Sequence, residues 1–252
     1  MKEKTVYYQD ESNNEFSKAK IETPKIPSSY RYRRDRFYER IFRNFLYYGI
    51  FKPFGFLYLK IKFHWKVIGK EKLKDFKDKP LFLYGNHTQT LGDALLPAFL
   101  FSRKIRILVH PNNLRSPFIG WAVPYLGGYP LPQSIANYRS FFHALEKSVE
   151  KKEPIVLYPE AHLWPYYTKI RPFKKDSFHY PVALNTPTFC FTNTYHKRKN
   201  PNSVQIITYI DGPFYPIPNE EEKESLARQV REAMQKRALL SDKELIHYQK
   251  EP

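Results

Sequence analysis

Short apolar runs alternate along this chain with segments in which hydrophobic residues recur every three or four positions. The runs predict strands at residues 63–68, 81–84, 105–109, 129–131, 155–158, 188–192 and 204–210. The helical spacing predicts helices at 94–101, 117–125 and 134–151. A last helix is expected after Asn219 as its N-cap, with Glu222 completing a capping box. This alternation predicts an α/β fold with a central, mostly parallel sheet flanked by helices.

The first sixty residues divide into two parts by the same criterion. Residues 1–29 are polar, with five basic and five acidic side chains, which predicts a flexible tail that is mostly coil. Residues 35–60 carry aromatic and aliphatic side chains at helical spacing, and we expect Pro53 and Gly55 to divide them into two amphipathic helices. Residues 61–252 are long enough to form one well-buried domain.

Positive charge concentrates in the segment at 30–60 and just beyond it. The chain carries a net charge of +17, and residues 30–75 hold 13 Lys or Arg against 4 Asp or Glu. Aromatic rings beside basic side chains suit the headgroup level of a membrane, so we predict that 30–60 associates with an anionic membrane surface. An ordinary helix packed on the domain is the alternative. A nucleic-acid-binding module is a third interpretation, but no recognised motif supports it and we expect no nucleic-acid partner.

Other features limit the compartment and the chemistry. The single cysteine, Cys190, lies in an apolar run, which favours a buried thiol over a nucleophile and excludes a disulfide within the chain. The N-terminus does not resemble a signal peptide, and no run of 18 uncharged apolar residues predicts a spanning helix. We therefore expect a peripheral or monotopic protein on the cytoplasmic side of the cell membrane.

Polar motifs follow two of the predicted buried strands. Asn86 and His87 come directly after the strand at 81–84, with Asp93 shortly beyond, and Pro159 and Glu160 follow the strand at 155–158. Parallel strands bring such motifs to one edge of a sheet. Imidazole accepts a proton near neutral pH, and a carboxylate beside it fixes the tautomer and stabilises the imidazolium. The pattern predicts a general-base pair.

These residues resemble the glycerophospholipid acyltransferase family, whose best-known members are the 1-acylglycerol-3-phosphate acyltransferases. That family carries N-H-x4-D and, about seventy residues later, a block similar to F-P-E-G-T-R-S. The resemblance extends over about residues 40–240 and implies transfer of a fatty acyl group from a thioester donor to a hydroxyl of a lysophospholipid-type acceptor. It implies His87 as the base and Asp93 as its orienting partner. The donor is acyl-CoA or acyl-carrier-protein, and no bound cofactor is expected.

This chain departs from the family pattern at two places. Five residues rather than four separate His87 from Asp93, and the second block reads Glu160-Ala161-His162-Leu163-Trp164, without the glycine and arginine. An extra residue on a regular helix rotates a side chain by about 100°. A phosphomonoester acceptor is therefore less strongly implied than acyl transfer itself, and loss of activity is a further alternative.

The resemblance and the residues together nominate a set of substrate contacts. Glu160 would accept a hydrogen bond from the acceptor hydroxyl or from a backbone amide. Asn86 would either shape the turn or contact substrate. Pro159 and His162 flank Glu160 in the same block, and His162 would either pack or contact substrate. Arg171 would replace the missing arginine and grip a phosphate, or else belong to a solvated basic face.

A metal hydrolase is the remaining alternative. His87, Asp93, His110, Glu160 and His162 supply ligand atoms of suitable type, but no H-E-x-x-H or H-x-H pair and no cysteine cluster is present in the sequence. We therefore predict no metal site.

Overall fold

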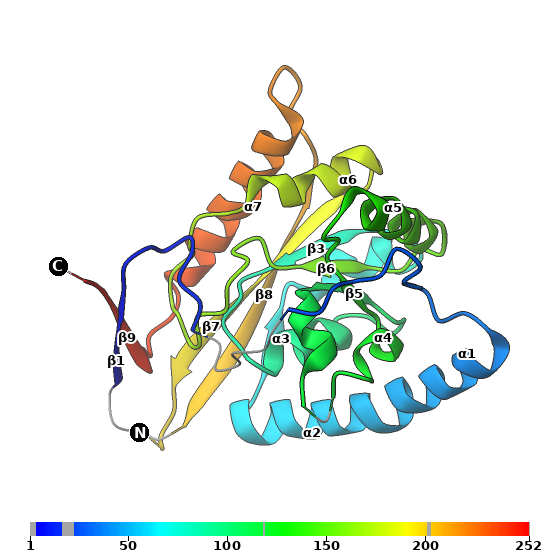
Figure 1. Cartoon of the computed structure of the whole chain (residues 1–252). Helices are drawn as coiled ribbons and strands as arrows, with labels where there is room; N and C mark the ends of the chain where they lie inside the picture. Colours follow the sequence, from blue (N-terminus) through cyan, green and yellow to red (C-terminus); the bar gives the residue numbers. More distant parts are fainter. Residues whose placement is uncertain (1–3, 17–22, 118, 201–202, 252) are drawn as a thin grey trace.

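The computed structural model describes residues 4–16, 23–117, 119–200 and 203–251. Its centre is a seven-stranded sheet in the order β2-β8-β7-β3-β6-β4-β5 (Figure 1). All neighbouring strands in this sheet run parallel except β7 and β8, which are antiparallel. The predicted α/β class with a mostly parallel sheet is confirmed. The strands are β2 Lys66–Ile68, β3 Phe82–Gly85, β4 Arg106–Val109, β5 Gly128–Pro130, β6 Ile155–Leu157, β7 Thr188–Lys197 and β8 Val204–Phe214.

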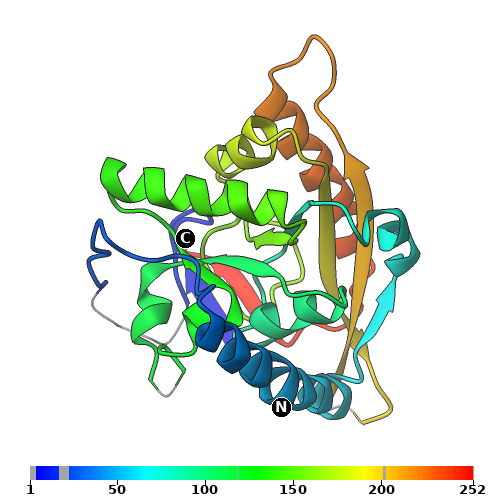
Figure 2. The same cartoon turned by 90° about the vertical axis from the view of Figure 1, so that its right-hand side faces the viewer.

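Helices cover both faces of the sheet (Figure 2). One face carries the N-terminal helices and the short α3 Gly92–Leu95, and the other carries α5 Ile135–Glu150 and α7 Glu222–Ala238. The remaining α-helices are α4 Val123–Leu126 and α6 His179–Ala183. Tight 3₁₀ turns occupy Lys70–Phe76, Leu96–Phe99, Pro111–Arg115 and Lys175–Phe178.

The N-terminal helix is continuous, so the predicted interruption at Pro53 and Gly55 is wrong. It consists of α1 Phe37–Asn44, a π-helical stretch Phe45–Phe51 and α2 Lys52–Phe63. In the π-helical stretch the Lys52 amide donates five residues back to the Tyr47 carbonyl. Pro53, which has no amide hydrogen, begins the next helix without losing a donor. Gly55 is a packing position, because a Cβ there would lie 2.7 Å from the Leu95 side chain.

Several predicted boundaries are displaced. The first strand begins at Lys66 instead of residue 63, because α2 extends to Phe63 and ends at His64 in the left-handed conformation. The last helix is capped by Glu221, whose carboxylate accepts the Glu224 amide, and Asn219, the predicted cap, lies before it with a φ of 67°. The helix predicted at 117–125 is reduced to α4, and residue 118 lies outside the described residues.

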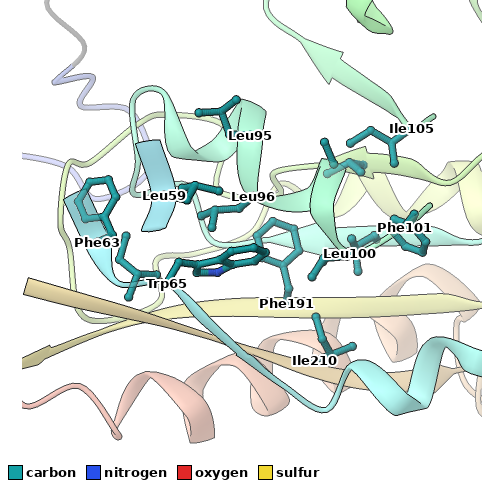
Figure 3. Close-up of a cluster of buried hydrophobic side chains, with 14 of the residues drawn as sticks. Leu59, Phe63, Trp65, Leu95, Leu96, Leu100, Phe101, Ile105, Phe191 and Ile210 are labelled. Atoms are coloured by element: carbon teal, nitrogen blue, oxygen red, sulfur yellow. The ribbon is translucent and has the colours of Figure 1, made fainter. Parts of the chain in front are cut away.

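The hydrophobic core is built on both faces of the sheet. Figure 3 shows the cluster between the N-terminal helix and the sheet, where Leu59, Phe63 and Leu96 surround Trp65 above Phe191 and Ile210. Trp65 also donates its ring N–H to the Thr208 hydroxyl at 2.8 Å. Because Leu59 and Phe63 are fully buried here, α2 is an integral part of the domain.

The two ends of the chain form a small sheet of their own. β1 Lys4–Tyr8 pairs in parallel with β9 Ile246–Lys250 (Figure 1). The coil predicted for residues 1–29 is therefore wrong at Lys4–Tyr8, while residues 1–3 and 17–22 of that tail lie outside the described residues. Phe16 packs edge-on against Trp164, with 5.1 Å between ring centroids. This contact places the N-terminal segment over the second polar block.

Candidate active site

The two polar motifs meet because their strands are neighbours. β3 and β6 pair in parallel, with Tyr84 opposite Leu157, so the residues that follow each strand emerge at the same edge of the sheet. The Trp164 amide donates to the His87 carbonyl at 3.1 Å, and the Tyr166 amide donates to the Thr88 carbonyl at 2.9 Å. The residues after β3 and those after β6 are thus bonded side by side, as the sequence predicts.

His87 and Asp93 are in direct contact. Nδ1 of His87 lies 2.7 Å from Oδ2 of Asp93, and the same oxygen accepts the Gln89 amide at 2.9 Å. Helix α3 begins only at Gly92, so residues 88–91 form a turn before the helix. An extra residue in this turn does not rotate Asp93 about a helix axis. Tyr195 of β7 fixes that turn, because its hydroxyl donates to Thr88 Oγ1 at 2.7 Å and accepts from Gln89 at 3.0 Å. The extra residue is absorbed in this turn.

The electrostatic environment of the pair is unequal. Asp93 is buried, and burial raises the pKa of its carboxyl group, an effect that the hydrogen bonds from His87 and the Gln89 amide oppose. The His87 side chain keeps a quarter of its surface exposed. The imidazole is therefore reachable from outside, while the carboxylate behind it is shielded from water.

Tyr158 is a contributor that the sequence interpretation missed. Its ring stacks on the His87 imidazole with 4.7 Å between centroids and 22° between planes, and its hydroxyl donates to the Asp93 carbonyl. The available signal was an aromatic residue at the end of a buried strand, directly before Pro159 and Glu160. One side chain thus contacts both members of the pair.

Glu160 faces inward and connects two backbone segments. Its Oε2 accepts the His87 amide at 3.0 Å, and its Oε1 accepts the Arg171 amide at 2.9 Å. This is the backbone-amide alternative of the two that the sequence left open. Pro159 is buried beside it, and its carbonyl accepts the Lys174 amide at 2.8 Å. The arrangement holds the His87 backbone in place.

Arg171 is buried, so the interpretation of this residue as part of a solvated basic face is wrong. Its guanidinium lies 3.4 Å from Glu160, donates to the carbonyls of His162 and Glu11, and stacks over the Trp164 ring. Burial lowers the pKa of this guanidinium, while the charge of Glu160 opposes the shift. A phosphate contact by Arg171 stays a prediction, and the N-terminal segment at Glu11 covers this side chain.

Asn86 and His162 are placed differently from each other. The Asn86 amide is buried, donates to the Asn193 carbonyl at 3.0 Å and accepts the Asn193 amide at 2.8 Å, which ties the end of β3 to β7. His162 keeps about a third of its side chain exposed and pairs with Glu15 at 3.0 Å. Asn86 thus has a structural partner at both ends of its amide, and His162 lies under the N-terminal segment.

Ala161 has a backbone conformation that glycine favours. Its φ of 63° is in the left-handed region, which glycine adopts freely and an alanine adopts at a cost of about 1 kcal/mol. The turn after Glu160 thus holds its backbone in a conformation that glycine would adopt without this cost.

Two further observations delimit the site. Among the described residues, no group of three or more His, Cys, Asp or Glu side chains is arranged to hold a metal ion. A groove of about 650 Å³ lies between α7 and residues 172–175, and none of the predicted site residues lines it. The pair at His87 therefore lies apart from this groove.

The chain belongs to the Acyltransferase family, whose family model matches residues 64–217 and thus includes both polar motifs. Among solved structures, it is similar to the crystal structure of the 1-acyl-sn-glycerophosphate (LPA) acyltransferase PlsC from Thermotoga maritima, with a TM-score of 0.58. The two are 19% identical, and the match covers 82% of this chain and 85% of that one. No curated protein matches the sequence. At this identity the structural likeness establishes the shared fold.

Proposed function

We propose that this acyltransferase moves a fatty acyl group from a thioester donor to a hydroxyl of a lysophospholipid-type acceptor, with His87 as general base and Asp93 as its orienting partner. The observation that carries the proposal is the 2.7 Å contact between His87 and Asp93 in a chain of this family. It also speaks against loss of activity through the five-residue spacing, because the spacing does not separate the two groups.

The chemistry requires one proton relay. With Nδ1 facing Asp93, Nε2 of His87 is the nitrogen available to take the proton of the acceptor hydroxyl as its oxygen attacks the thioester carbonyl. The C–O ester bond forms, the C–S bond breaks, and the proton passes from His87 to the departing thiolate. No acyl-enzyme is needed. Cys190 is fully buried and burial raises the pKa of its thiol, which makes it a poor nucleophile.

A second acceptor class is favoured by one observation. Arg171, the first arginine after Glu160 in the sequence, is engaged by Glu160 and by two carbonyls. An acceptor without a phosphomonoester, such as a lysophospholipid with a zwitterionic headgroup, does not require that guanidinium for binding. Lysophosphatidic acid therefore stands beside other lysophospholipids as a candidate acceptor.

Membrane association completes the proposal. The helix from Phe37 to Phe63 exposes eleven large apolar side chains, and the only acidic residue along it, Glu39, is buried and paired with Arg31. No helix among the described residues is long and apolar enough to cross a bilayer. We propose that this face rests on an anionic membrane surface, on the cytoplasmic side, where the lipid acceptor is presented.

The direct test is an acyl-transfer assay on the purified protein. Radiolabelled acyl-CoA and acyl-carrier-protein are each offered with lysophosphatidic acid and with lysophosphatidylcholine in mixed vesicles. Formation of diacyl product with at least one pair supports the proposal. Thioester hydrolysis without ester formation, across all pairs, would contradict it.

A further inference from the structure

A tight turn next to α4 presents two large apolar residues to solvent. Ile119 is 52% exposed and Trp121 is 59% exposed, while Gly120 and Ala122 between and after them are buried. The Gly120 amide donates to the Ser116 carbonyl at 2.8 Å, and the Ala122 amide donates to the Ile119 carbonyl at 2.9 Å. A Cβ on Gly120 would lie 2.4 Å from the Leu114 carbonyl oxygen, so only glycine fits. The backbone is thus fixed with both side chains outward.

This turn adjoins the exposed face of the N-terminal helix. Trp121 lies beside Phe42, with 6.3 Å between ring centroids, and Tyr125 of α4 meets the same ring edge-on at 5.1 Å. Figures 1 and 2 both show α4 beside α1. Phe42 is itself 41% exposed, so the apolar surface continues from α1 onto the turn at 119–122. Two segments far apart in sequence share one surface.

The charges around this surface favour lipid over a second protein. Arg40 lies over the Phe37 ring at 6.0 Å, Lys60 over Phe56 at 5.9 Å and Arg34 over Tyr125 at 6.0 Å. Residues 111–122 contain no acidic side chain. Rings flanked by cations match a layer of anionic headgroups above acyl chains, because the rings enter the interface while the cations stay at headgroup level.

We infer that the turn at 119–122 is a second membrane contact, in which Ile119 and Trp121 enter the interface together with the helix face. The inference rests on the membrane association proposed above and goes beyond it. One helix lying in the interface leaves the domain free to roll about the helix axis. A second contact to the side of that axis fixes the roll and with it the direction in which the His87 site faces.

The test uses the fluorescence of Trp121. The chain has three tryptophans, of which Trp65 and Trp164 are buried. The emission of the full-length protein minus that of Trp121→Phe therefore reports Trp121. With vesicles of phosphatidylglycerol and phosphatidylcholine, we expect a blue shift of this difference spectrum. Replacement of phosphatidylcholine by its chain-brominated form should quench it. Flotation in the same samples measures binding separately.

Substitution gives a second readout. Trp121→Ser should weaken vesicle partitioning by about tenfold, since it removes a large apolar side chain that the membrane interface would bury. Tyr215→Ser is the control, because Tyr215 is 54% exposed and follows β8 at the end of the sheet away from α1 (Figure 1). Vesicle-bound protein with an unquenched, unshifted Trp121 would overturn the inference and leave membrane association standing. Absence of flotation would overturn both, while the acyl-transfer assay with soluble short-chain acceptors still tests the chemistry.

Discussion

Nδ1 of His87 contacts Oδ2 of Asp93 at 2.7 Å although five residues, rather than the four usual in this family, separate them in the chain. Helix α3 does not begin until Gly92, and the Gln89 amide binds the same carboxylate oxygen at 2.9 Å. A helical rotation argument therefore does not apply to this segment. From this contact we predict different effects of substitution on activity and on stability.

Asp93→Asn should lower activity and leave stability unchanged or increased. A raised pKa means that the folded state favours the protonated carboxyl, so ionisation of buried Asp93 at neutral pH costs folding free energy. A neutral amide removes that cost, but it no longer fixes the His87 tautomer, which should reduce the acyl-transfer rate by about 10²–10⁴-fold. Thermal unfolding and kinetics on one preparation check both. A less stable variant with full activity would contradict the assignment.

Glu160→Gln should destabilise the protein by about 3–5 kcal/mol, because it leaves the buried Arg171 guanidinium without its carboxylate. Glu160→Gln combined with Arg171→Met should be less destabilised than Glu160→Gln alone. Urea unfolding of wild type, the two single variants and the double variant measures the free energies of this double-mutant cycle. Glu224→Gln is the matched control, since it breaks a shorter ion pair, 2.7 Å to Lys175, that is exposed, and it should change little. Equal effects at the two sites would refute the role of burial.

Glu153→Gln should remove part of the acid sensitivity of folding. Burial alone would raise the pKa of Glu153, but Arg106 and Arg33 outweigh it and lower the pKa to about 2. The ordinary value is 4.5, so this stabilisation is present above about pH 4.5 and is lost as the pH falls toward 2. The shift corresponds to about 3 kcal/mol at neutral pH.

Urea unfolding of wild type and Glu153→Gln between pH 7 and pH 2 follows this difference. The two curves should converge as the pH falls. Glu150→Gln serves as control, because Glu150 is exposed and pairs with Lys147 of the same helix. A constant difference between wild type and Glu153→Gln across this range would show that the carboxylate charge is not responsible.

Membrane binding should separate into a salt-sensitive and a salt-resistant part. Arg40→Gln should weaken binding to anionic vesicles at low salt by about 1 kcal/mol and have little effect at high salt. Ile41→Ser and Phe45→Ser should weaken vesicle binding at low and at high salt, since these side chains are more than half exposed on α1 and its π-helical continuation. Leu239→Ser, 86% exposed after α7, is the control. Equal binding to neutral and anionic vesicles would exclude the electrostatic part.

The fold and the position of the site were predictable because their signals are local. Apolar runs mark the strands, and parallel pairing of β3 with β6 then brings His87 and Glu160 together. Pro53 was misleading because a π-helical turn, which depends on packing of the whole helix, compensates for its missing amide hydrogen. The pairing of β1 with β9 was not predictable, since each strand is short and polar and finds its partner more than two hundred residues away.

Within the site, side-chain direction was the part that sequence did not determine. Arg171 carries the same charge whether it faces solvent or the core, and only the packing of Trp164 and the N-terminal segment decides between these. From the sequence, Tyr158 was interpreted only as the last residue of a strand. Its stacking on His87 could not be predicted, because it depends on the angle between two neighbouring strand ends. Contacts of this kind follow from tertiary structure.

The most direct test of the central claim is the acyl-transfer rate of His87→Ala, measured with the donor and acceptor pair that wild type uses. Removal of the base should lower the rate by about 10²–10⁴-fold. His143→Ala, which removes an exposed imidazole paired with Glu146 on α5, should retain most of the activity. Circular dichroism and thermal unfolding confirm that each variant is folded. A folded His87→Ala protein that transfers acyl groups at the wild-type rate would contradict the mechanism.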